Sequence, residues 1–132
     1  MAAALTRELR ASYAFVERNF NLSKRYWGWE VAFMVYSVAG ALAVTLIGLD
    51  QNSARLILSL MVGAIFWNYL SVVFSIIGEQ ISWERWEGTL EYTMMAPVRR
   101  ASQLVGASIY AVIWGLIHTT VVLTVLVLFF GI

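Results

Sequence analysis

Three long stretches of this chain contain no Asp, Glu, Lys or Arg, and they constrain its fold more than any other feature. They cover residues 31–49, 56–78 and 101–132, and are 19, 23 and 32 residues long. A helix of about 20 apolar residues crosses the hydrocarbon core of a bilayer. The chain is 61% hydrophobic and only 13% charged, against about 25% charged in soluble domains. The sequence therefore predicts an all-α membrane protein with three transmembrane helices.

The distribution of Lys and Arg predicts how these spans are oriented. Of the nine cations, eight precede the first stretch or lie between the second and third, and the ninth is Arg55. Loops rich in Lys and Arg stay in the cytoplasm. We therefore expect a multi-pass protein of the cytoplasmic membrane, with its N-terminus and residues 79–100 in the cytoplasm.

The first 25 residues have the pattern of an amphipathic helix that lies in the cytoplasmic membrane interface. Its apolar residues recur at helical spacings of three and four, and they are Leu5, Leu9, Tyr13, Val16 and Phe20. Membrane lipid is the expected partner of this helix, and a helix packed on a soluble partner is the alternative. Cations and aromatic rings that suit the headgroup region occur at Arg18, Lys24, Arg25, Trp27, Trp29, Arg99 and Arg100.

These features divide the chain into six segments of a single transmembrane domain. The third apolar stretch would be about 48 Å long as one helix, so we place its start in the interface. Its apolar end leads us to expect that the sequence is part of a longer protein. The predicted segments are an interfacial helix (1–25), a first span (26–50), an outer turn (51–55), a second span (56–78), a cytoplasmic loop (79–103) and a third span (104–132).

The cytoplasmic loop contains a predicted short helix over residues 82–95. One stripe of this helix is apolar and comprises Trp83, Trp86, Leu90 and Met94, and a neighbouring stripe is acidic and comprises Glu84, Glu87 and Glu91. Ser82 is a candidate N-cap, and Pro97 disfavours helix at the preceding residue. We expect the apolar stripe to pack on the spans. The acidic stripe would face a partner or simply water.

Small residues and a few polar residues stand out within the spans. Ser59 and Gly63 in the second span, like Ala41 and Thr45 in the first, have the four-residue spacing that favours helix packing. Tyr110, Trp114 and His118 share one face of the third span.

His118 is the one histidine of the chain. It is either a pathway residue or a neutral ring hydrogen-bonded to a neighbouring helix. Glu79 is predicted to pair with Arg25 or Arg85, or to serve in coupling. With no Cys and no second His, a metal site is not expected.

The loop resembles that of a known family. Glu79, Arg85, the run Gly88-Thr89-Leu90-Glu91, Pro97 and Arg100 resemble the cytoplasmic loop of type-2 ABC export permeases. The resemblance implies an elbow helix before the first span and a coupling helix over residues 82–95. The implied docking residues for an ATPase are Trp83, Glu84, Arg85, Trp86, Glu87, Gly88, Thr89, Leu90 and Glu91.

The same resemblance implies the partners and cofactors. A separate ABC ATPase subunit would hold ATP and magnesium, and this chain would hold no cofactor and bind no nucleic acid. Permeases of this family usually have six spans, so the remaining helices and a second copy are expected partners. No G-x-x-x-x-G-K-[ST] phosphate loop occurs in the sequence, so we expect a permease subunit and not an enzyme.

Two alternatives belong to other functional classes. The first is a small membrane scaffold or accessory subunit with no transport cycle of its own. The second is a proton-linked transporter that uses His118, which would require more ionisable residues in the spans than this sequence has.

Overall fold

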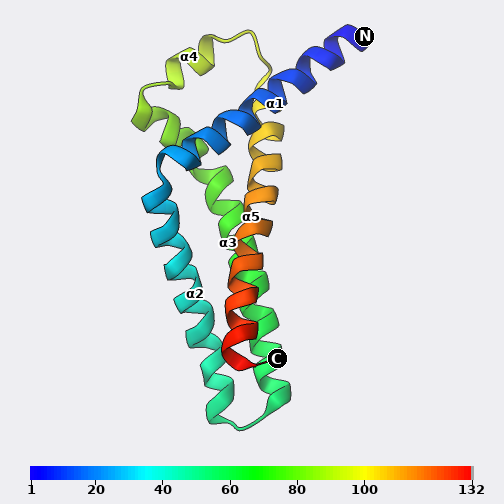
Figure 1. The fold of residues 1–132 in the computed structure, drawn as a ribbon. Coiled ribbons are helices and arrows are strands. Elements are labelled where there is room, and N and C mark those ends of the chain that lie inside the picture. The colour runs from blue at the N-terminus through cyan, green and yellow to red at the C-terminus, as the bar shows by residue number, and fades with distance from the viewer. Residues whose placement is uncertain (132) are drawn as a thin grey trace. The chain divides into compact units, whose positions relative to one another are not determined.

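The computed structural model describes residues 1–131, which form five α-helices and no β-strand. The helices are α1 (Ala2–Arg25), α2 (Trp27–Asp50), α3 (Ala54–Glu87), α4 (Leu90–Met95) and α5 (Arg100–Phe130) (Figure 1). Helices α2, α3 and α5 are long and apolar enough to cross a membrane. The prediction of an all-α chain with three such helices is therefore confirmed.

Two compact units make up the chain, and both α3 and α5 contribute residues to each of them. The first unit comprises Met1–Arg25 and Val73–Ile113, so it contains α1, α4, the last part of α3 and the first part of α5. The second unit comprises Tyr26–Val72 and the α5 residues from Trp114 onward.

In the second unit, small residues allow α2 to approach α3 closely. Ala41, Thr45 and Gly48 are the buried residues of α2, and the spacing of the first two predicts their packing. A Cβ atom added to Gly48 would lie 2.9 Å from the Cα atom of Ile57. The two backbones are therefore too close at this point for a larger residue.

The core of the second unit is apolar. Ala41, Met61, Val122 and Leu126 are buried together, and they come from α2, α3 and α5. Ser59 and Gly63, which are predicted to pack against another helix, are exposed, so no helix among residues 1–131 packs closely on them. A Cβ atom on Gly63 would meet no atom within 4 Å.

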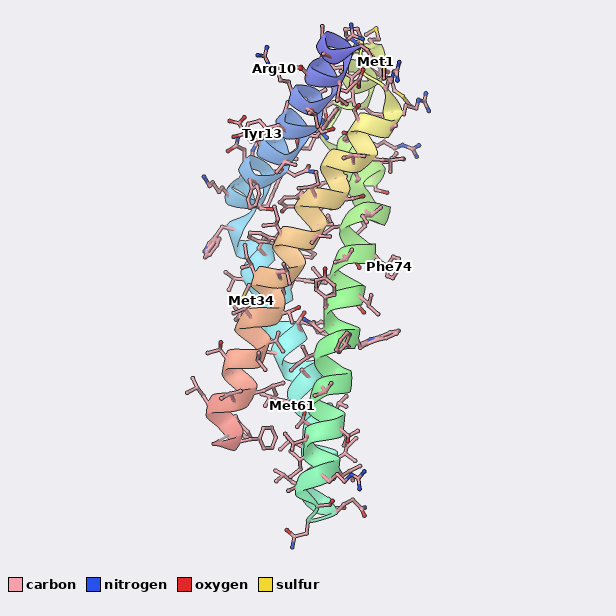
Figure 2. All side chains as sticks on the ribbon, turned by 90° about the vertical axis from the view of Figure 1, so that its right-hand side faces the viewer. Met1, Arg10, Tyr13, Met34, Met61 and Phe74 are labelled. Carbon is pink, nitrogen blue, oxygen red and sulfur yellow. The ribbon has the colours of Figure 1, made fainter. Side chains whose placement is uncertain are left out.

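In the first unit, α1 crosses α3 and α5 (Figure 1). The side of α1 that contacts them is polar. Ser12, Asn19 and Ser23 are the buried residues of α1, whereas Leu9 and Tyr13 of its apolar stripe are exposed. Figure 2 shows Tyr13 pointing away from the helices that α1 contacts.

Candidate partner-docking site

Helix α3 does not end with the apolar stretch at residue 78 but continues to Glu87. Ser82 therefore lies inside α3, and the predicted N-cap role of Ser82 is wrong. A single glycine such as Gly78 costs a helix only about 1 kcal/mol. The Glu, Gln and Arg residues that follow it are good helix formers, so no local signal stops the helix before Gly88.

Gly88 ends α3 through a Schellman motif. Its φ angle of 72° lies in the left-handed region, which glycine adopts without steric cost. The Gly88 N–H donates to the Arg85 carbonyl at 3.3 Å, and the Thr89 N–H donates to the Glu84 carbonyl at 3.0 Å. These two bonds are the pair that defines this helix ending. The helix predicted over residues 82–95 is therefore two pieces separated by a turn.

Helix α4 is the second piece, and it ends where the sequence predicts. Ala96 is extended, with φ −65° and ψ 142°, as expected of a residue before proline. Helix α5 then begins at Arg100, four residues before the predicted third span.

Glu84 is buried, with 3% of its surface exposed, so the prediction that it belongs to an exposed acidic stripe is wrong. It forms an ion pair with Arg18 of α1. The Nε2 of Gln103, in α5, donates to both Glu84 carboxylate oxygens at 3.1 and 3.3 Å. A buried carboxylate is tolerated when it is paired and hydrogen-bonded in this way.

The aromatic stripe of the loop does not pack inward as predicted. Trp86 is 80% exposed and Met94 is 55% exposed, whereas Trp83 and Leu90 are partly buried. The rings of Trp83 and Trp86 meet edge to face, with centroids 5.9 Å apart. The exposed indole of Trp86 is thus available to another molecule.

Around the Gly88 turn, charged and aromatic side chains are exposed together. Arg85 and Glu91 are exposed, while Glu87 and Thr89 are partly buried. Tyr92 of α4 is 74% exposed. We call the exposed residues Arg85, Trp86, Glu91, Tyr92 and Met95 the α4 surface.

The predicted membrane-interface residues fall into two groups. Arg18 is partly buried and paired with Glu84, so its guanidinium contacts the protein itself. The other six are exposed, and they are Lys24, Arg25, Trp27, Trp29, Arg99 and Arg100.

The residues proposed for a pathway or for packing lie in different surroundings. Glu79 is exposed on α3, and no ion pair found among residues 1–131 includes it. In the first unit, the Tyr110 hydroxyl is hydrogen-bonded to that of Ser23, and its ring meets Phe20 edge to face at 5.0 Å. Tyr110 therefore fastens α1 to α5.

His118 lies in the second unit and is 1% exposed. Its ring centroid is 5.9 Å from that of Phe33 and 6.4 Å from that of Trp114. Neither ring nitrogen has a hydrogen-bond partner among residues 1–131, so the expected bond to a neighbouring helix is absent there. Trp114 instead donates from Nε1 to the Glu30 carboxylate at 3.1 Å.

Sequence reasoning missed the residues that hold the loop in place. Asn19 of α1 and Gln80 of α3 exchange two amide hydrogen bonds, each 3.3 Å long. Sequence reasoning also did not identify Gln103 or Thr93. The polar residues on one side of α1 could have indicated these contacts, but such residues on an amphipathic helix usually indicate a face exposed to water. Within residues 1–131, no cluster of three or more His, Asp or Glu side chains is arranged to hold a metal ion.

Comparisons with known proteins add no relative to this description. No protein-family model, curated protein or solved structure matches the chain.

Proposed function

We propose that this chain is the membrane permease part of a type-2 ABC exporter and that it docks a separate ATPase subunit through the α4 surface. The supporting observation is the arrangement around Gly88. A helix break presents the α4 surface, and the carboxylate of Glu84 beneath it is tied to α1 and α5. An exposed group of side chains on a fixed support suits a site that receives force from another protein.

In this proposal, α1 is the elbow helix, and α4 together with the last turn of α3 forms the coupling element. The exposure of Leu5, Leu9 and Tyr13 on one side of α1 supports contact with lipid, since soluble surfaces rarely carry such a stripe. If water surrounded every face of α1 instead, this exposed apolar stripe would have no function.

ATP hydrolysis belongs to the partner in this proposal. The ATPase subunit would hold ATP and magnesium, and this chain, with its remaining spans and a second copy, would convert ATPase motion into export across the cytoplasmic membrane. Movement of a docked helix as a rigid body is one established way to couple such events.

Co-purification tests the docking directly. The full chain, purified in mild detergent from its own membranes, should retain a protein that carries a phosphate loop and hydrolyses ATP. Reversing the charge of Glu91 (Glu91→Lys) should weaken that retention, because charged residues at the rim of an interface steer association. The matched control is Glu17→Lys, the same change at an exposed position of α1.

The two outcomes separate the proposed function from its main alternative. If Glu91→Lys and Glu17→Lys retained the ATPase equally well, Glu91 would not be part of the interface. A stable complex without any ATPase would instead favour the scaffold or accessory subunit.

The proposed orientation has its own test. The chain has no cysteine, so single cysteines at Ser53 and Ser82 can be labelled with a membrane-impermeant thiol reagent on intact cells. We expect labelling at Ser53→Cys and none at Ser82→Cys, since the distribution of cations places residues 79–100 in the cytoplasm. The reverse pattern would overturn this orientation.

A further inference from the structure

We infer that Arg18 is a positioning residue for α4, because it is fixed by its ion pair with Glu84 of α3 and donates a hydrogen bond to Thr93 of α4. The inference rests on the proposed function, because it adds α1 to the element that the ATPase would engage. It concerns a cation that its place in the sequence assigns to lipid headgroups.

The guanidinium of Arg18 contacts both sides of the Gly88 turn. One terminal nitrogen pairs with Glu84 in the last turns of α3. The other donates to the Thr93 hydroxyl of α4 at 3.3 Å. The guanidinium carbon also lies 5.0 Å from the centre of the Phe15 ring, a distance that favours a cation–π contact.

Helix α4 depends on such contacts because it cannot hold its own position. It has six residues and none of them is buried, and an isolated helix of that length is unstable in water. Its backbone is joined to α3 through a glycine turn and to α5 through an extended Ala96. Thr93 supplies the hydrogen bond that joins α4 to another helix among residues 1–131.

The surroundings of Glu84 explain why Arg18 is the residue that fixes this arrangement. The carboxylate is 3% exposed, and its other side-chain donor is the neutral amide of Gln103. Without Arg18, a buried negative charge would be left with only that amide, which is costly enough to force local rearrangement. The backbone connects α4 to α3 and to α5. A displacement of α4 is therefore also transmitted to α1, through the side chain of Arg18.

Distance measurements between spin labels test this inference in the full chain. Because the sequence has no cysteine, labels at Glu17→Cys on α1 and Tyr92→Cys on α4 are unique, and both positions are exposed. In lipid bilayers, we expect one narrow distance peak with Arg18 present and loss of that peak in Arg18→Met. Arg10→Met, which removes an exposed cation of the same helix, should leave the peak unchanged. Arg18→Lys, which keeps a charge for Glu84, should retain more of the peak than Arg18→Met.

A second variant decides the matter if Arg18→Met does not accumulate in the membrane. Thr93→Val removes the bond from Arg18 to α4 and leaves the ion pair in place, and it should also broaden the peak. An unchanged narrow peak in Arg18→Met overturns the inference. If Arg18→Met does not accumulate, an unchanged narrow peak in Thr93→Val overturns it.

Failure of this inference can be told apart from failure of the proposed function, because the distance measurement needs no ATPase. A peak that is lost in Arg18→Met, in a chain that captures no ATPase, supports the positioning role and counts against the proposed function. A peak that is unchanged in Arg18→Met, in a chain that does capture an ATPase, overturns the positioning role alone.

Discussion

The two units of the chain are held together by different chemistry. In the first unit, α1 contacts α3 and α5 through charged, amide and hydroxyl groups, with the Arg18–Glu84 pair among them. In the second unit, the buried cluster between α2, α3 and α5 is apolar and includes Met61 and Leu126, and Trp114 of α5 also donates a hydrogen bond to Glu30 of α2. The Thr45 hydroxyl there is hydrogen-bonded within its own helix, to the Ala41 carbonyl at 2.8 Å.

This difference is the one expected if hydrocarbon surrounds the second unit and a more polar medium surrounds the first. Hydrocarbon offers no hydrogen bonds, so polar groups in a span are satisfied within the helix or by a neighbouring helix. A charged pair is easier to keep where water or lipid headgroups solvate its edges. The chemistry of the contacts therefore agrees with membrane spans in the second unit and with a more polar environment for the first.

The largest effect should come from removing the charge at the centre of the first unit. Glu84→Ala leaves Arg18 without its partner, and we expect a loss of about 3 kcal/mol, the lower end for a broken buried pair because Arg18 is partly exposed. Equilibrium unfolding in SDS, followed by tryptophan emission, measures this loss. Glu91→Ala is the matched control at an exposed position, and it should stay within about 0.5 kcal/mol of the wild type.

Equal stability of Glu84→Ala and Glu91→Ala would contradict the polar account of the first unit. It would mean that the Arg18–Glu84 pair adds nothing measurable to the stability of this unit.

A smaller effect is expected in the apolar core of the second unit. Leu126→Ala empties a site that is completely buried, and in a soluble protein such a change costs about 2–5 kcal/mol. We expect the low end, about 2 kcal/mol, because lipid tails are as apolar as leucine and only the packing is lost. The same SDS unfolding assay applies, with the exposed Leu128→Ala as the control.

If Leu126→Ala proved as mild as Leu128→Ala, the three helices of the second unit would not owe their association to this cluster. Their stability would then come from contacts outside this cluster.

The three helices that are long and apolar enough to cross a membrane could be predicted from the sequence because the property that identifies them is local. A segment that crosses hydrocarbon must be apolar over its whole length. Glu30 and Asp50 flank the first apolar stretch, and Arg55 directly precedes the second. The predicted first span, residues 26–50, accordingly differs by one residue at its start from α2.

The candidate site was harder to predict because its contacts are not local. Glu84 is buried by Arg18, which lies 66 positions away in the sequence, and no spacing rule connects them. The helical stripes of residues 82–95 predict that Trp86 packs inward and that Glu84 faces outward. The structure reverses both assignments. Gly88, with its positive φ angle, ends α3 inside this segment.

The smallest effect is expected at His118, where the chemistry of the second unit is least typical. Its nitrogens have no partner among residues 1–131, so His118→Gln removes no hydrogen bond that the structure contains. What it does remove are the ring contacts to Phe33 and Trp114. We expect normal accumulation in the membrane and a stability change within about 1 kcal/mol, with His118→Phe as a control that keeps an aromatic ring. If His118→Gln abolished accumulation while His118→Phe did not, ring packing at this position would be essential. If both variants accumulated but transport failed, His118 would belong to the pathway and not to the packing of the unit.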